Sequence, residues 1–426
     1  MTAKKIPDCD ICVFFRAYND IDHITPILYR LKLDSPNLKI TVIMLEYKTN
    51  YYEDYRILFL NSLNIKFVSI SDLGFFSTFL NNGYKRIRKT ILSWNSSNML
   101  RRVVTRFTIF YEKTIDSKIN TIDPVLFLET KFDIKPKLFI FDQNNNSFYR
   151  KLAELSNSFG IKSIAVPHGH TILSNELHSN TLMEISLGES PFGDFMPYNY
   201  DFVVFENQLI ADRYVRYGFL KGVQAKVIGS SRYSDEWMEK IPQIINTQSL
   251  KFGQKKKLKI VFMLSKITYN GFQAEIDRTV EFITKFKDVF LIVKPHTRYK
   301  RLEHKKKDNL FIDNKHEYHS PNLIDWADLI IFEHSCISFH ALKKNKPTLY
   351  LSSTHANRLM SEDYFTSWEA KCRDDIRNTI YCLLKDKRYQ TYEIQKAVGY
   401  IKKIIEPLGK DILGNYSNLI LGLIND

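Results

Sequence analysis

Short apolar runs alternate with longer amphipathic segments through almost the whole chain. In the first half the apolar runs cover residues 10–15, 40–45, 65–70, 138–141, 161–166, 201–206 and 226–228. A second series covers residues 259–264, 289–293, 329–332 and 348–351. Apolar runs of this length are typical of parallel strands that are buried on both faces. Their alternation with helical segments predicts βα units.

The chain is long enough for two hydrophobic cores. Its 426 residues exceed the size of one ordinary core, and a polar, lysine-rich segment at 243–257 separates the two series. We therefore predict an α/β fold of two doubly wound, Rossmann-like domains, covering 1–242 and 258–400, with a cleft between them. A helix is predicted over 24–33 with Pro26 in its first turn, where proline is tolerated.

Two histidines follow the apolar run 161–166, in the sequence Val-Pro-His-Gly-His. Ligands of open α/β sheets bind beyond the carboxyl ends of the strands, and Gly169 lets the backbone turn sharply or approach a ligand there. Imidazoles titrate near neutral pH, so we predict that one of these two, His168 or His170, is a general base. Either could instead be a structural histidine bonded to a carbonyl. Further candidates for the base are Asp142, Glu206 and Asp20.

The second half repeats this pattern of polar residues after apolar runs. The run 289–293 is followed by Lys294, His296 and Thr297. The run 329–332 is followed by Glu333, His334, Ser335 and Ser338. Ser335 and Ser338 flank a predicted helix start, whose free N–H groups favour a phosphate. A plain N-cap is the alternative for Ser335. Ser265 ends the run 259–264 and could contact a nucleotide, or could belong to a solvent-exposed loop.

Several catalytic fingerprints are missing from the sequence. It contains neither a phosphate-binding P-loop nor a G-x-G-x-x-G motif, so ATPase and dinucleotide-dependent activities lack their signatures. No group of His, Cys and carboxylate residues has the spacing of metal ligands. We expect neither a metal nor a cofactor.

The formal net charge of +14 indicates an anionic partner, which could be a nucleotide, a nucleic acid or an anionic lipid. The stretch 84–113 interleaves basic and apolar residues around Trp94, as in helices that lie on anionic membranes. It could equally be a core helix with a basic face, or bind an anionic acceptor. We expect neither a signal peptide nor a membrane span. We expect a cytoplasmic protein, with peripheral binding to the inner face of the membrane as an open alternative.

Several of these motifs together resemble a known family. The chain resembles GT-B transferases of bacterial surface polysaccharides in several motifs. These are His168-Gly169, the strand-helix-glycine segment 201–218, the Gly-x-x-Arg turn at Gly229 and Arg232, the Lys-Pro-His turn at Lys294 and the pair Lys346-Pro347. The nearest patterns are CDP-glycerol glycerophosphotransferases of teichoic-acid assembly and capsule Kdo transferases. The resemblance covers roughly residues 160–355. It departs at His296-Thr297, where the family has His-Pro, and at Glu333–Ser338.

The resemblance implies a function. The chain would transfer a sugar or polyol phosphate from a nucleotide-activated donor, cytidine-linked or alternatively UDP- or GDP-linked, to a glycan or lipid-linked glycan acceptor. The first domain would hold the acceptor and the base, with His168 as the match to the family's His-Gly and His170 in reserve. The second domain would hold the donor, with Arg232 among the donor-binding residues. Residues 401–426 would form a helix that crosses back to the first domain. Basic side chains and a helix N-terminus would stabilise the leaving phosphate.

Two rival functions stay open. A sugar-nucleotide epimerase has the same fold and would turn over its substrate without an acceptor. A polyanion-binding protein would show strongly salt-dependent affinity for any polyanion. The sequence carries no recognised nucleic-acid-binding motif, so no nucleic-acid partner is expected.

Overall fold

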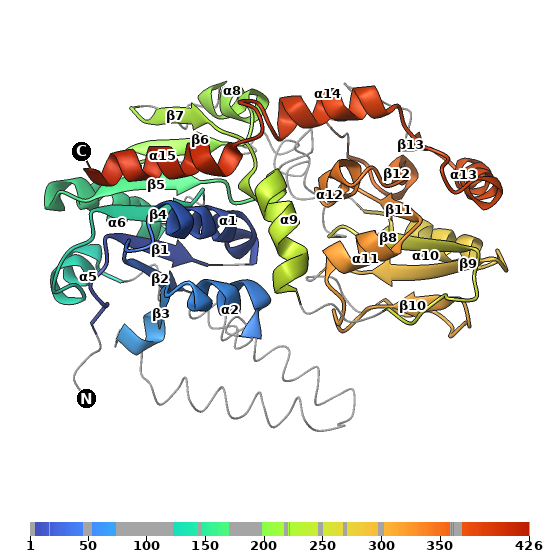
Figure 1. Cartoon of the computed structure of the whole chain (residues 1–426), viewed down its shortest axis with the longest axis horizontal. Helices are drawn as coiled ribbons and strands as arrows, with labels where there is room; N and C mark the ends of the chain where they lie inside the picture. The colour runs from blue at the N-terminus through green and yellow to red at the C-terminus, as the bar shows by residue number, and fades with distance from the viewer. Residues whose placement is uncertain are drawn as a thin grey trace, which may run out of the picture. The chain divides into compact units, whose positions relative to one another are not determined.

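A computed structural model describes residues 5–16, 18–45, 53–73, 122–143, 147–169, 198–216, 220, 222–245, 250–266, 271–296, 302–357, 359, 361 and 369–425. The chain divides into two compact units (Figure 1). The first unit comprises Met1–Gly169, Phe195–Ser234 and Pro407–Asp426, and the second comprises His170–Asp194 and Asp235–Glu406.

The described part of the first unit is built on a sheet of seven parallel strands in the order β3-β2-β1-β4-β5-β6-β7. These strands are β1 (Ile11–Phe15), β2 (Ile40–Met44), β3 (Lys66–Ser69), β4 (Leu138–Asp142), β5 (Lys162–Val166), β6 (Phe202–Phe205) and β7 (Gln224–Val227). The helices are α1 (Tyr18–Asp34), α2 (Tyr55–Ser62), α5 (Pro124–Thr130), α6 (Ser147–Ser156), α8 (Gln208–Arg216) and α15 (Ile412–Asn425). Short 3₁₀ turns are η2 (Ile70–Leu73), η3 (Asn157–Phe159) and η4 (Ser231–Tyr233).

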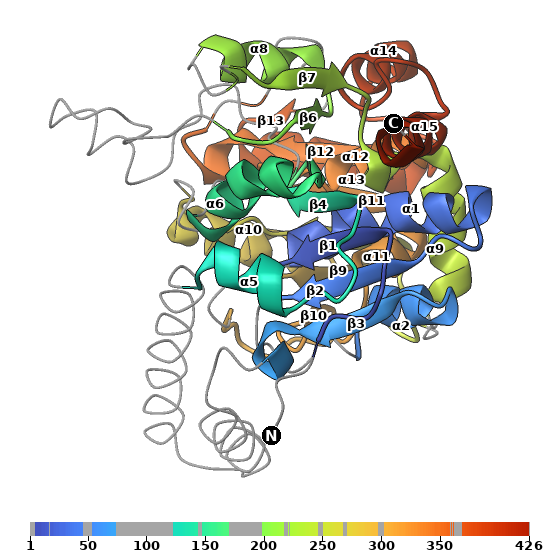
Figure 2. The same ribbon diagram turned by 90° about the vertical axis from the view of Figure 1, so that its left-hand side faces the viewer.

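Side chains of the first sheet alternate between two cores, because successive residues of a strand point to opposite faces. Ile11, Val13 and Phe15 join the aliphatic core beneath α1 and α15. Phe14 faces the other way, where it stacks on Phe141 at 4.9 Å within an aromatic cluster that includes residues of α5 and α6. Figures 1 and 2 show these two helix pairs on opposite faces of the sheet.

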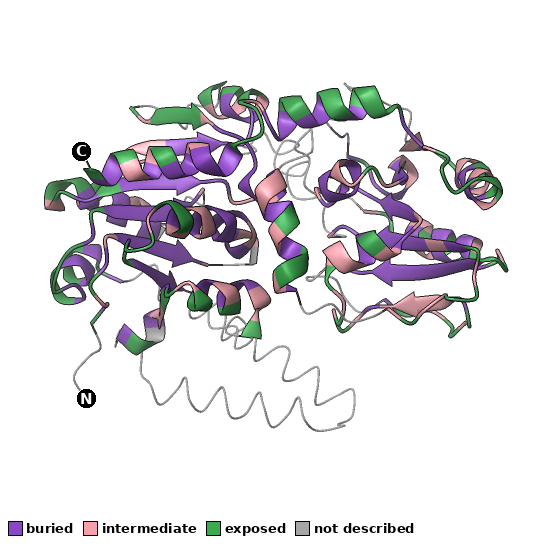
Figure 3. Cartoon of the chain, viewed as in Figure 1, coloured by how far each residue is buried: buried purple, intermediate pink, exposed green. Residues whose placement is uncertain are grey.

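The described part of the second unit contains six parallel strands in the order β10-β9-β8-β11-β12-β13. These strands are β8 (Leu258–Met263), β9 (Val289–Lys294), β10 (Leu310–Ile312), β11 (Leu329–Phe332), β12 (Thr348–Leu351) and β13 (Glu369–Ala370). The helices are α9 (Asp235–Ile244), α10 (Gln273–Ile283), α11 (Ser320–Trp326), α12 (Ser338–Lys343), α13 (Arg373–Lys385) and α14 (Ile394–Ile404), with a 3₁₀ turn η5 (Ser352–Thr354). Central strands are buried along their whole length, whereas outward faces of the helices are exposed (Figure 3).

Each sheet has one point at which the strand order reverses. In the first sheet β1 lies between β2 and β4, and in the second sheet β8 lies between β9 and β11. At such a point the connections from neighbouring strands leave in opposite directions and open a crevice beyond the carboxyl ends, where doubly wound sheets bind ligands. The fold thus predicts a site at the ends of β1 and β4, and another at the ends of β8 and β11.

The prediction of two doubly wound domains is confirmed, with differences in detail. The first domain was predicted to end at residue 242, but α9 belongs to the second unit, which starts at Asp235. The segment that returns to the first unit starts at Pro407 rather than at residue 401, and its helix α15 packs on α1. The edge strands β10 and β13 were not predicted. The interdomain cleft stays a prediction.

The start of α1 was predicted wrongly. The helix begins at Tyr18, so Pro26 lies inside it and not in its first turn. A proline inside a helix costs about 3 kcal/mol, because it removes a hydrogen bond and crowds the preceding turn. Here the helix also buries a complete apolar face on the sheet, which outweighs that cost: Ile21, Ile24, Ile27, Leu28 and Leu31 are all 0% exposed.

Candidate functional site

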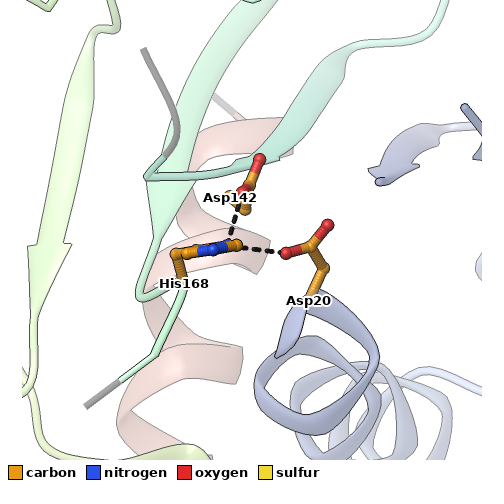
Figure 4. Close-up of side chains that lie close together, drawn as sticks. All are labelled: Asp20, Asp142 and His168. Carbon is orange, nitrogen blue, oxygen red and sulfur yellow. Dashed lines mark hydrogen bonds and ion pairs between the residues drawn. The ribbon is translucent and has the colours of Figure 1, made fainter. Parts of the chain in front are cut away.

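A histidine between two aspartates lies at the reversal point of the first sheet. Asp142 is the last residue of β4, Asp20 is in the first turn of α1, directly after β1, and His168 follows β5. Figure 4 shows both carboxylates pointing at the same edge of the imidazole. Three elements that are distant in sequence thus bring their polar side chains to one place.

Both aspartates contact the same nitrogen of the imidazole. Its Nδ1 lies 2.8 Å from Asp20 Oδ1 and 2.7 Å from Asp142 Oδ2. Asp20 is itself fixed, because its other oxygen accepts a hydrogen bond of 2.6 Å from the backbone N–H of Arg16. Both aspartates are 0% exposed, whereas the His168 side chain is 29% exposed. The ring is therefore the part of this triad that a substrate can reach.

The surroundings of His168 favour its protonated form. Burial disfavours the charged ring, but hydrogen bonds and charge from Asp142 and Asp20 outweigh it and raise the pKa of His168 to about 9. Burial, reinforced by the charge of Asp142, raises the pKa of Asp20 even though His168 opposes this effect. Arg16 adds a second cation, with its Nη2 3.4 Å from His168 Nε2 and 3.7 Å from Asp142 Oδ2. Two cations thus balance two carboxylates.

This arrangement suits proton transfer. A carboxylate at Nδ1 fixes the tautomer and orientation of an imidazole and stabilises the imidazolium, which leaves Nε2 to exchange a proton with a substrate. The three residues could also hold a divalent cation, since one ligand atom from each lies within 4.8 Å of the others. Such an ion would have to displace the proton of His168, and the nearby Arg16 guanidinium would repel it. The absence of a metal stays a prediction.

A second imidazole–carboxylate pair lies next to this triad and was missed by the sequence analysis. His23 is on α1, one turn beyond Asp20, and its Nδ1 is 3.5 Å from Glu206 Oε1. The same Glu206 oxygen accepts a hydrogen bond of 2.8 Å from Ser230. Both residues of the pair are almost fully buried. Burial lowers the pKa of His23 to about 4, although the charge of Glu206 acts to raise it. Glu206 is thus enclosed and is a weaker candidate for the base than His168.

Arg232 belongs to the first unit, where it follows β7 in the turn η4. Its Nη1 lies 3.3 Å from Asp22 Oδ2, and Asp22 also pairs with the buried Arg56. Asp54, the N-cap of α2, holds the same guanidinium of Arg56 from another side. Arg232 therefore contributes to an ion-pair network that ties α1, α2 and η4 together. Its predicted contact with a donor stays a prediction.

The reversal point of the second sheet joins two of the predicted donor-binding residues. Glu333, directly after β11, accepts a hydrogen bond of 2.7 Å through Oε2 from the backbone N–H of Ser265, directly after β8. Burial raises the pKa of Glu333 to about 7, although hydrogen bonds from Ser265 and Thr354 act to lower it. The other Glu333 oxygen and the Ser265 hydroxyl are buried without a hydrogen-bond partner in the described residues. Such atoms are where a polar ligand group can bind.

Other predicted donor-binding residues have structural contacts. The Lys294 ammonium lies 2.5 Å from Asp313 Oδ2 and donates to the Tyr318 carbonyl oxygen at 2.7 Å, so two of its three donors are occupied. The ring of His334 packs edge-on against His355, with centroids 4.5 Å apart.

The remaining donor candidates lie at or before the start of α12 and after β9. Ser335 Oγ accepts a weak bond of 3.5 Å from the Ile337 N–H, as a capping residue would, and Ser338 is buried at the first position of the six-residue α12. Of the described donor candidates, His296, Ser335 and Arg232 are half-buried, and the others are buried. His170, Thr297 and the stretch 84–113 lie outside the described residues.

Comparisons with known proteins test the fold. No family model and no curated protein matches the sequence. Solved structures do match over nearly the whole chain. The structure of S. aureus MnaA with UDP is 13% identical, with 98% of each chain covered and a TM-score of 0.55. A UDP-GlcNAc 2-epimerase from Neisseria meningitidis, bound to UDP-GlcNAc, is also 13% identical, with coverage of 97% and 99% and a TM-score of 0.55.

A third solved structure links the fold to the predicted resemblance. A variant of the wall teichoic acid polymerase TagF, soaked with CDPG, is 11% identical, with 98% of this chain and 89% of that chain covered and a TM-score of 0.52. The chain has the two-domain GT-B fold. At these identities the likeness establishes the fold, and the predicted GT-B resemblance is confirmed at that level. In the described residues no helix is long and apolar enough to cross a membrane.

Proposed function

We propose that this GT-B protein is a transferase of bacterial surface-polysaccharide assembly. It moves a sugar or polyol phosphate from a nucleotide-activated donor to a glycan or lipid-linked glycan acceptor. The observation that carries this proposal is the position of His168, at the reversal point of the first sheet with both aspartates at Nδ1 and with its side chain partly exposed. The motifs shared with teichoic-acid and capsule transferases support the choice of reaction.

The proposed mechanism is a single displacement. Nε2 of neutral His168 accepts the proton of the acceptor hydroxyl while that oxygen forms a bond to the donor. The bond between the transferred group and the nucleotide's leaving phosphate breaks, and the phosphate keeps the electron pair. Asp20 and Asp142 stabilise the resulting imidazolium. With a pKa of about 9, His168 is a strong base that is mostly protonated at neutral pH, so the rate should rise with pH.

The second unit is the proposed donor site. Ser265 and Glu333 offer unpaired polar atoms at its reversal point, which suit the uncharged polar groups of a nucleoside. His296 and Ser335 are the half-buried candidates for the phosphate. Of the structures with this fold, one was soaked with CDPG and another contains UDP, which supports a nucleotide donor. The family motifs favour cytidine, with uridine and guanosine donors next.

Epimerisation of a nucleotide sugar is the second candidate function. The UDP-GlcNAc 2-epimerase from Neisseria meningitidis shares this fold with a TM-score of 0.55. A protonated imidazole beside two carboxylates could also exchange a proton with carbon. Dependence on an acceptor separates the two functions, because an epimerase consumes its nucleotide sugar alone and a transferase does not.

A nucleotide screen tests the proposal. We expect CMP or CDP to stabilise the protein against thermal unfolding more than UDP or GDP, by about 2.7 kcal/mol at a hundred times the Kd. The activated donor that corresponds to the best nucleotide is then incubated with and without glycan acceptors. Donor consumption that requires an acceptor supports the transferase. Conversion of a nucleotide sugar without acceptor identifies an epimerase, and equal, salt-sensitive binding of all polyanions would indicate a polyanion-binding protein.

A further inference from the structure

A buried histidine of the second unit, His355, lies beside two of the proposed donor residues and was not predicted from the sequence. It directly follows the turn η5 after β12 and is 3% exposed. Its ring packs edge-on against His334, the residue after Glu333, with centroids 4.5 Å apart. Thr354, directly before His355, contacts the Glu333 carboxyl. His355 therefore belongs to the same cluster as Glu333 and Ser265, at the reversal point of the second sheet.

The contacts of His355 define which ring nitrogen carries a proton. Its Nδ1 accepts a hydrogen bond of 3.0 Å from the backbone N–H of Asn357. Burial lowers the pKa of His355 to about 4, so the ring is neutral near pH 7. A neutral imidazole carries one proton, and because Nδ1 is the acceptor, that proton is on Nε2. His355 thus presents an N–H donor at Nε2.

Three polar atoms of this cluster are buried without a hydrogen-bond partner in the described residues. They are Nε2 of His355, Oε1 of Glu333 and Oγ of Ser265. Buried polar groups of native proteins are nearly always paired, because an unpaired group has lost its bonds to water and gained none in return. These three atoms follow the carboxyl ends of strands, where doubly wound sheets bind ligands. Their position indicates that a ligand supplies the missing bonds.

The cluster suits an uncharged polar group. In the described residues no charged side chain contributes to raising or lowering the pKa of Glu333 or of His355. A phosphate is bound by cations or by several N–H donors, whereas this cluster offers one N–H, one hydroxyl and one carboxyl. A ribose or a nucleobase carries acceptor atoms for the N–H and hydroxyl or N–H groups for the carboxyl. The nucleoside half of a nucleotide therefore fits better than its phosphates.

We propose that His355 is a specificity-determining residue of the donor site, which donates a hydrogen bond from Nε2 to the nucleoside half of the nucleotide beside Glu333 and Ser265. The phosphates bind outside this cluster. This inference rests on the proposed donor site in the second unit and deepens it, because it assigns one residue to one half of the ligand. Loss of the bond should weaken the nucleotide and its nucleoside by the same factor.

Two replacements of His355 separate the roles of its nitrogens. His355→Asn places an amide oxygen near the position of Nδ1, so it keeps the acceptor for Asn357 and removes the donor at Nε2. His355→Gln reaches the position of Nε2 with its amide N–H and restores the donor. His304→Asn is the matched control, because the His304 side chain is 8% exposed and pairs with Asp277 of α10.

Calorimetry measures binding of CDP, UDP and GDP and of the matching nucleosides cytidine, uridine and guanosine. For the nucleotide that wild type binds best, His355→Asn should lose about tenfold in affinity, as expected for one buried hydrogen bond. The nucleoside alone should lose the same factor, and inorganic pyrophosphate should bind all variants equally. His355→Gln should stay within about threefold of wild type, and His304→Asn should bind as wild type does.

Three results would overturn the inference. Unchanged nucleotide affinity of folded His355→Asn would do so and leave the donor site standing. A loss for the nucleotide but not for its nucleoside would assign the bond to a phosphate. If wild type binds no nucleotide, the donor site and the inference fail together.

Thermal unfolding checks that each variant folds. Should His355→Asn not fold, Ser265→Ala tests the same cluster, because it removes a single hydroxyl. It has to weaken the nucleotide and its nucleoside alike, and unchanged binding of both would equally contradict the inference.

Discussion

His168 shows how neighbours define the chemistry of one residue. An isolated histidine titrates near pH 6.5, but two buried carboxylates raise this pKa to about 9. The sequence predicted His168 as the base because it follows an apolar run, and it placed Asp142 and Asp20 among the further candidates. It missed His23, because a lone histidine within a helical segment carries no signal until the helix is placed against β6. It also could not show that Lys294 pairs with Asp313, a contact between side chains from separate segments.

The pKa of His168 predicts the pH dependence of transfer. If neutral His168 is the base, kcat/KM should rise with pH and reach a plateau above about pH 9, because raising the pH removes the proton from Nε2. Asp20→Asn removes one negative charge at Nδ1, so the midpoint should move to lower pH. Asp34→Asn, at the other end of α1, is the matched control and should leave the midpoint unchanged. A rate that falls above pH 9 would instead mean that His168 acts as an acid.

The observed strands match the sequence-based predictions in the buried centre of each sheet and differ from them at the sheet edges. Central strands such as β4 and β9 were predicted within a residue or two, because their apolar runs have no other stable environment. The edge strands β10 and β13, of three and two residues, carry too short a pattern. The start of α1 was missed because Pro26 reads as a helix boundary, whereas burial against the sheet keeps the helix intact. That error hid the fact that Asp20 and His23 share one helix.

The return helix α15 gives a prediction at this scale. Ile420 is 0% exposed in the core that α15 shares with α1, so Ile420→Ala should lower the free energy of unfolding by about 2–5 kcal/mol. Urea denaturation measures this change. Asn418→Ala alters an exposed position on the same helix and should stay within about 0.5 kcal/mol of wild type. Equal stability of the two variants would mean that α15 does not contribute to the core of the first unit.

The whole molecule repeats one design in two units. Each is a doubly wound sheet, and each has buried carboxyl groups where the strand order reverses: Asp20 and Asp142 in the first, Glu333 in the second. The alternating pattern of the sequence was sufficient to predict this architecture. The identity of donor and acceptor depends on pocket contacts that the pattern does not encode. Proton transfer is proposed for the first unit and nucleotide binding for the second, so the two properties should be separable by substitution.

Replacement of His168 tests this division most directly. His168→Gln is compared with wild type and with His319→Gln, an exposed control in the second unit, in the transfer reaction and in calorimetric binding of the selected nucleotide. The account predicts that His168→Gln binds the nucleotide as wild type does while transfer falls about 10²–10⁴-fold, the usual effect of losing a general base. The control should retain both properties. Transfer by a folded His168→Gln protein at close to the wild-type rate would contradict the account.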